Sequence, residues 1–123
     1  MLPWVHMHLW PAGTAYPCCM SDPDLPIGDT QTQSLQEIWN GEQLRTIRQN
    51  MLADKPSPEC RRCYELEENN MWTLRNSANE NFKHHRDKVI VTDSNGYAGD
   101  VNMAYMDIRF SSLCNLKCRS CGP

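Results

Sequence analysis

Three cysteines lie within eight consecutive residues near the end of the sequence, at Cys114, Cys118 and Cys121. The residues between them are mostly polar and include Lys117 and Arg119. A cysteine that only packs in a core usually stands alone among apolar neighbours. The spacing C-x3-C-x2-C therefore predicts a loop whose thiolates hold a soft metal centre.

The number of thiols narrows the kind of metal centre. A structural zinc site takes four protein ligands in a closed tetrahedron, whereas this loop offers three. The plant-type iron-sulfur spacing is C-x4-C-x2-C with a distant fourth cysteine, and the first spacing here is one residue shorter. Three thiolates on a four-iron cluster would leave one iron open to a small molecule.

The cysteine loop follows the run Ala104–Ser111, and the two together resemble the signature of the radical SAM enzymes. The resemblance implies that Cys114, Cys118 and Cys121 hold a 4Fe-4S cluster whose open iron is chelated by S-adenosylmethionine. In that family an external electron donor reduces the cluster, which cleaves S-adenosylmethionine to a 5'-deoxyadenosyl radical that abstracts hydrogen from the substrate. The sequence defines neither the substrate, a peptide or a small molecule, nor any catalytic residue.

Four more cysteines, Cys18, Cys19, Cys60 and Cys63, form a second candidate set of metal ligands. Cys60 and Cys63 follow a helix-start signal at Ser57–Glu59, so we expect them one turn apart on one helix face, ~5–6 Å between their β-carbons. A position near a helix N-terminus is expected to lower the thiol pKa and to favour thiolates. A pair of buried structural thiols is the alternative for Cys60 and Cys63.

The spacing Gly13-x4-Cys18, followed at a distance by Cys60-x2-Cys63, resembles the auxiliary iron-sulfur module called SPASM, or its shorter relative twitch. The segment Leu35–Asn40 between these motifs adds to the likeness. The resemblance implies an auxiliary iron-sulfur cluster that relays electrons or binds substrate. In most such enzymes the module follows the barrel, and here it precedes the signature loop.

The sequence departs from the SPASM pattern at one ligand. The first cysteine of the module normally precedes the glycine, but no cysteine lies between Met1 and Gly13. We expect either that Cys19 takes its place or that the chain begins late in the module.

The order of the elements predicts an α+β fold. Trp4–Trp10 alternates with period two and predicts a strand, which a turn at Gly13 and a returning arm at Ala15–Cys19 complete as a hairpin. A capping box of Ser34 and Glu37 predicts a helix start. That helix is expected to end at a left-handed cap formed by Asn40–Gly41.

Further helices and strands are expected along the rest of the chain. Leu44, Ile47 and Met51 recur at helical spacing and predict a second helix that covers the hairpin. Glu65–Phe82 is compatible with helix throughout. Val89–Thr92 is β-branched and predicts a short strand.

We divide the chain into three segments. Residues 1–82 form the small hairpin-plus-helices SPASM/twitch-like module, and residues 83–103 form a linker with the short strand. Residues 104–123 form the first strand and cluster loop of a truncated partial (β/α) TIM-type barrel. Because a barrel takes ~200 residues or more, we expect a fragment, whose strand at Ala104–Ser111 has an unpaired, aggregation-prone edge.

Two pairs of polar residues on the predicted strands could also serve a site. His6 and His8 share one face and could chelate a metal, but no third ligand is close in sequence, so we expect hydrogen-bonded sheet residues. Asp107 and Arg109 also share a face, and either contact substrate or cofactor or form a structural salt bridge.

The composition bears on partners and compartment. A formal net charge of −3 and a pI near 5.7 argue against a nucleic-acid surface. No run of 18 or more apolar residues and no signal peptide is present, so we expect no membrane partner. An odd number of cysteines, seven, favours a reducing, cytoplasmic location.

Two alternatives stay open at this point. The first is a zinc-binding interaction module, in which Cys18, Cys19, Cys60 and Cys63 hold one ion and the last three cysteines borrow His84 or His85. The second is a small iron-sulfur electron carrier that never binds S-adenosylmethionine.

Overall fold

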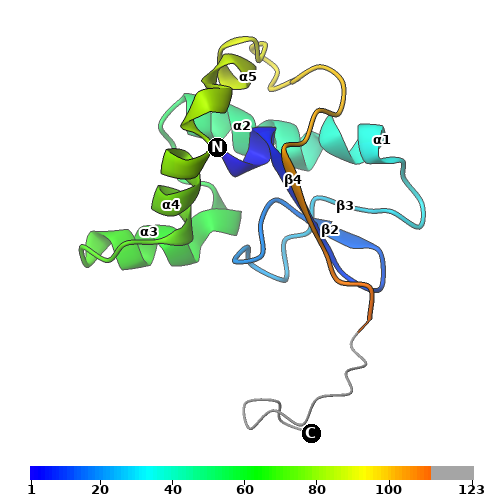
Figure 1. Cartoon of the computed structure of the whole chain (residues 1–123), viewed down its shortest axis with the longest axis horizontal. Coiled ribbons are helices and arrows are strands. Elements are labelled where there is room, and N and C mark those ends of the chain that lie inside the picture. Colours follow the sequence, from blue (N-terminus) through cyan, green and yellow to red (C-terminus); the bar gives the residue numbers. More distant parts are fainter. Residues whose placement is uncertain (112–123) are drawn as a thin grey trace, which may run out of the picture.

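A computed structural model describes residues 1–111 of the chain. Within them, a mixed four-stranded sheet has the order β3-β2-β1-β4. Its strands are β1 (His6–Leu9), β2 (Thr14–Tyr16), β3 (Gly28–Asp29) and β4 (Tyr105–Ile108). Figure 1 shows β4 running alongside β1, while the helices lie around the sheet. The fold is therefore α+β, as the sequence predicts.

The predicted N-terminal hairpin is confirmed, with shorter arms. A 3-10 helix, η1 (Leu2–Trp4), occupies the start of the expected strand. β1 and β2 pair antiparallel with His8 opposite Tyr16. Gly13 has a φ of +90° in the turn between them, a conformation that glycine adopts without steric cost.

Two helices cover one face of the hairpin, α1 (Leu35–Trp39) and α2 (Glu42–Leu52). Ser34 and Glu37 form the predicted capping box at the start of α1. The predicted left-handed cap is wrong, because Gly41 has a φ of −66° and serves as the N-cap of α2. The buried core comprises Met7, Ala15, Ile27, Ile38, Trp39, Leu44 and Ile47.

The segment of helix-compatible composition, Glu65–Phe82, contains the end of one helix and the whole of a second. A 3-10 turn, η2 (Pro58–Cys60), leads into α3 (Arg61–Glu68). Asn70 has a φ of +58° and ends that run. A new capping box at Thr73 then starts α4 (Leu74–Asn81), and Figure 1 shows α3 and α4 together at the end of the molecule farthest from α1.

The predicted strand at Val89–Thr92 is wrong. A 3-10 helix, η3 (Lys83–His85), leads into α5 (Arg86–Ile90), and the amide of Val91 donates to the carbonyl of Asp87 at 3.1 Å. Val89 and Ile90 form the end of α5, and the amide of Thr92 donates to the carbonyl of Val89 at 3.3 Å. The segment therefore satisfies its backbone amides locally, and the strand preference of β-branched residues depends strongly on context.

β4 lies within the predicted strand at Ala104–Ser111 and pairs parallel with β1. One edge of β4 is paired with β1. β4 is the last strand of the sheet, so among the described residues its other edge carries no strand, as expected. His6 pairs with Tyr105 and His8 with Asp107, so these side chains share the sheet face opposite the core.

Both histidines of that face serve as sheet residues, as expected. His6 Nδ1 lies 3.3 Å from the carbonyl of Tyr105 and its ring stacks on the tyrosine at 4.5 Å. His8 Nδ1 lies 2.9 Å from Asp107 Oδ2. Asp107 thus makes its structural ion pair with a neighbouring strand residue, His8, and not with Arg109, which lies over the ring of Trp10.

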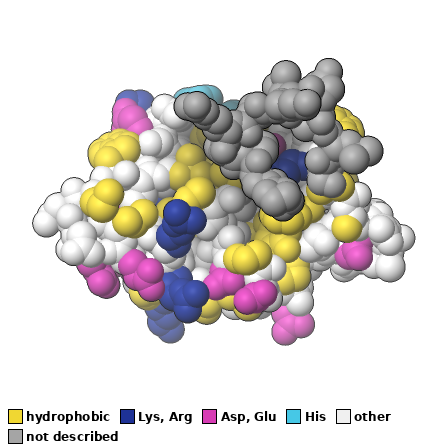
Figure 2. Space-filling model, turned by 90° about the horizontal axis from the view of Figure 1, so that it is seen from below, with side chains coloured by type: hydrophobic (Ala, Val, Ile, Leu, Met, Phe, Trp, Pro, Cys, Tyr) yellow, Lys and Arg dark blue, Asp and Glu magenta, His cyan; other side chains and the backbone are white. Residues whose placement is uncertain are grey.

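Figure 2 shows hydrophobic side chains interspersed with Lys, Arg, Asp and Glu on the described part of one face of the molecule. None of the helices within residues 1–111 is long and apolar enough to cross a bilayer.

Arg48 is a buried charge that joins three separate segments. Its side chain is fully buried on α2 and lies over the ring of Trp39 at 4.6 Å. Its guanidinium donates to the carbonyls of Pro3 (2.9 Å), Trp39 (2.8 Å) and Gly96 (3.2 Å). Burial lowers the pKa of Arg48 to about 10, which still leaves it charged at neutral pH.

We expect Arg48→Met to destabilise the protein by on the order of 2–3 kcal/mol, because three buried carbonyls lose their donor. The matched control is Arg45→Met on the same helix, whose guanidinium bonds the exposed carbonyl of Asn95 alone and should cost about 0.5 kcal/mol. Urea unfolding followed by circular dichroism measures both. Equal losses in the two variants would contradict the role given to Arg48.

Candidate metal centre

Cys18 is placed by the turn that follows β2. The amide of Met20 donates to Cys18 Sγ at 3.3 Å, and the amide of Ser21 donates to the Cys18 carbonyl at 3.2 Å. The next residue, Asp22, joins this turn to the second cysteine segment: its amide bonds the carbonyl of Glu59 at 3.2 Å, and its carboxylate accepts from Arg61 at 3.1 Å. These bonds hold the Cys18 turn against the start of α3.

Cys60 and Cys63 come from the predicted helix start. Pro58 occupies the first position of η2, where its missing N–H costs nothing. The amide of Cys60 donates to the carbonyl of Ser57 at 2.9 Å, and Cys60 is the N-cap of α3. Cys63 follows within the first turn of that helix and is buried.

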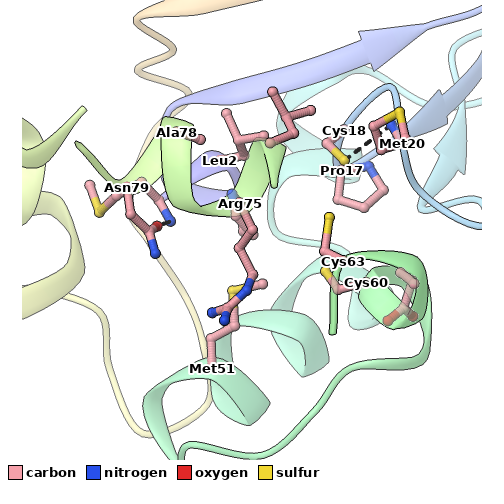
Figure 3. A pocket seen from close by; sticks show the side chains of 14 residues that line it. Leu2, Pro17, Cys18, Met20, Met51, Cys60, Cys63, Arg75, Ala78 and Asn79 are labelled. Atoms are coloured by element: carbon pink, nitrogen blue, oxygen red, sulfur yellow. Dashed lines mark hydrogen bonds between the residues drawn. The ribbon is translucent and has the colours of Figure 1, made fainter. Parts of the chain in front are cut away.

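The three thiols of Cys18, Cys60 and Cys63 line one cavity (Figure 3). Cys63 points toward Cys18, with Cys60 beside it. Apolar side chains from η1, the Cys18 turn, α2 and α4 form most of the remaining wall: Leu2, Pro17, Met20, Met51, Leu74 and Ala78.

Cys19 is not part of this arrangement. Its side chain is exposed and lines a different cavity, together with His6 and Tyr105. The structure thus brings together three of the four predicted thiols of the second set. The remaining predicted ligands, Cys114, Cys118 and Cys121, lie outside the described residues.

Burial decides the protonation of two of these thiols. Desolvation raises the pKa of Cys18 to about 11 and the pKa of Cys60 to about 12. The neighbouring thiols add to both shifts, since thiolates repel one another. The expectation that the helix N-terminus would lower the pKa of Cys60 is wrong, because removal from water outweighs the helix dipole.

The donor set at this cavity consists of sulfur atoms. Among residues 1–111, no group of three His, Cys, Asp or Glu side chains is gathered closely enough to bind one metal ion. Iron-sulfur clusters are held by cysteine thiolates that bind different irons, so their ligands need not converge on a point. Three cysteines that line one largely apolar cavity are therefore compatible with such a cluster.

Sequence reasoning missed one charged residue of this site. Arg75 on α4 lines the same cavity, and its guanidinium forms a bidentate pair with Glu67 on α3. Nothing in the cysteine spacing points to Arg75, because it lies 12 residues beyond Cys63 in a helix with few apolar residues. The chain reverses in the non-helical segment between α3 and α4, and this reversal brings Arg75 back toward the thiols.

We expect the metal-free protein to lose stability above pH 9. The folded pKa values of Cys18 and Cys60 lie above their ordinary value of 9.0, so the folded state keeps protons that the unfolded state releases. The contribution of these thiols to the free energy of unfolding is intact below pH 9.0 and is lost as the pH rises toward 11. For the pair, the loss is about 2 kcal/mol over the first pH unit.

Anaerobic urea unfolding at several pH values measures this loss. The free energy of unfolding should fall less with pH in a Cys18→Ser/Cys60→Ser variant, and an equal fall would refute the assignment.

Comparisons with known proteins agree with this site. A family model described as an iron-sulfur cluster-binding domain, SPASM, matches residues 1–64, which include Gly13, Cys18, Cys60 and Cys63. Curated proteins gave no match and neither did solved structures. Since the matched segment is more than half of the 123 residues, the chain belongs to the SPASM family of iron-sulfur cluster-binding domains.

Proposed function

We propose that this chain carries the auxiliary iron-sulfur cluster of a radical SAM enzyme, held by Cys18, Cys60 and Cys63. The observation that carries the proposal is the meeting of these three thiols at one largely apolar cavity within the family-matched segment. Cys19 is left out because its side chain is exposed and faces another cavity.

The residues of the cavity would hold and shield the cluster. When bound, an iron-sulfur cluster accepts or donates single electrons. Pro17, Met20 and Met51 would keep water from the sulfurs, and the amide of Met20 already donates to Cys18 Sγ. Such hydrogen bonds and solvent exclusion are the means by which a protein sets a cluster's potential.

We further propose that Cys114, Cys118 and Cys121 bind the 4Fe-4S cluster that receives S-adenosylmethionine. The support is their C-x3-C-x2-C spacing a few residues after the end of β4 at Ile108. The reaction would be hydrogen abstraction from a peptide or small molecule, with an external electron donor, in the reducing cytoplasm. The parallel pairing of β4 with β1 links this loop to the auxiliary module through the sheet.

Serine variants of individual cysteines test the auxiliary site. After anaerobic reconstitution with iron and sulfide, Cys18→Ser, Cys60→Ser and Cys63→Ser should each lose most of the auxiliary cluster's iron and its EPR signal. Cys19→Ser is the matched control, adjacent in sequence, and should retain both. A Cys114→Ser/Cys118→Ser/Cys121→Ser background isolates this signal from that of the loop.

The proposal fails if Cys19→Ser loses the cluster as completely as Cys18→Ser does. It also fails if the protein takes up stoichiometric zinc with no iron-sulfur chromophore, which would support the interaction module.

Addition of S-adenosylmethionine to the dithionite-reduced, reconstituted chain should change the EPR spectrum of the loop cluster, because an open iron can accept its amino and carboxylate groups. A Cys18→Ser/Cys60→Ser/Cys63→Ser background should keep this response. An unchanged spectrum would instead support a simple electron carrier.

A further inference from the structure

Arg75 brings a positive charge to the thiol cavity from outside the family-matched segment. It lies on α4, lines the cavity with Cys18, Cys60 and Cys63, and its side chain is 35% exposed. Figure 3 shows it extending away from Ala78 toward Met51, on the side of the cavity opposite the Cys18 turn. No other Arg or Lys lines this cavity among the described residues.

Glu67 and its neighbours fix the guanidinium in place. Arg75 Nε donates to both carboxylate oxygens of Glu67, at 3.0 and 3.1 Å, and Nη2 closes a second bond to Oε2. The hydroxyl of Thr73 also donates to Glu67, at 2.5 Å. The ring of Tyr64 lies under the guanidinium at 4.8 Å, so the cation is held from two sides.

The charge of Arg75 acts on one of the three thiols, Cys60. It opposes the rise in the pKa of Cys60 that burial causes, whereas the other thiols add to that rise. A fixed cation favours whichever state of a nearby group is more negative. The reduced form of a cluster carries one more negative charge than the oxidised form, and net charge is one of the factors that set a cluster's potential.

We propose that Arg75 and Glu67 act as a charge pair that tunes the auxiliary cluster: Arg75 stabilises the reduced cluster, while Glu67 positions Arg75 and offsets part of its charge. This inference rests on the proposed function, because it needs a cluster in the cavity. It adds α4 to a site whose ligands all precede it in the chain.

A redox titration monitored by EPR tests the pair on the full chain, reconstituted, with the three loop cysteines replaced by serine. Arg75→Met should shift the midpoint potential down, and Arg75→Lys should restore part of the shift. Glu67→Gln keeps an acceptor for Arg75 but removes the opposing charge, so it should shift the potential up. Arg62→Met is the matched control, since Arg62 lies beside Cys63 in sequence and does not line the cavity.

The directions of the potential shifts, and their dependence on salt, distinguish an electrostatic role from a merely structural one. The difference in midpoint potential between Arg75→Met and the wild type should become smaller as the salt concentration rises, because Arg75 is partly exposed and salt screens its charge. An unchanged or higher potential in Arg75→Met, a downward shift in Glu67→Gln, or an equal shift in Arg62→Met would each overturn the proposal.

A second measurement does not depend on any cluster. In urea unfolding of the metal-free chain, the double variant Arg75→Met/Glu67→Gln should lose less stability than the sum of the two single losses, because the two side chains interact. If the losses in the free energy of unfolding are additive, the interaction between Arg75 and Glu67 is refuted. If they are not additive but neither the wild type nor any variant assembles a cluster, the proposed function fails and the interaction between the two side chains stands.

Discussion

The parallel pairing of β1 with β4 is the constraint on which the rest of the structure depends. It joins residues about 99 positions apart, with His6 opposite Tyr105 and His8 opposite Asp107. Because β1 also pairs with β2, both edges of the N-terminal strand are satisfied. The hairpin that carries the Cys18 turn and the strand that precedes Cys114 are therefore parts of one sheet.

Two opposing electrostatic effects meet at the thiol cavity. Apolar walls remove water and favour neutral thiols, while a bound cluster needs thiolates. Among the described residues, Arg75 is the Arg or Lys side chain that lines this cavity, and Glu67 forms an ion pair with it. The contrast with Arg48 is informative, since that guanidinium is fully buried and bonds only carbonyls and the amide oxygen of Asn40, and so serves to join segments.

Several local signals in the sequence predicted local structure correctly, although the left-handed cap expected at Asn40–Gly41 is wrong, and long-range relations were predicted poorly. The capping box at Ser34 and the turn at Gly13 depend on residues next to them, and both are confirmed. The strand expected at Val89–Thr92 is wrong, because this segment satisfies its amides as the end and cap of α5, whereas a strand needs a partner that is distant in the sequence. Cysteine spacing grouped four thiols, but only the folded chain shows that Cys19 faces away and that Arg75 completes the cavity wall.

The raised pKa values of Cys18 and Cys60 also bear on how the protein survives before it receives iron. Thiol–disulfide exchange proceeds through the thiolate, and at neutral pH a thiol with a pKa near 11 is ionised in only ~1 molecule in 10,000. Newly made chains should therefore be slow to form mixed disulfides with small thiols such as glutathione at these two positions. The apolar residues that would exclude water from a bound cluster thus also protect its cysteine ligands from oxidation before the cluster is assembled.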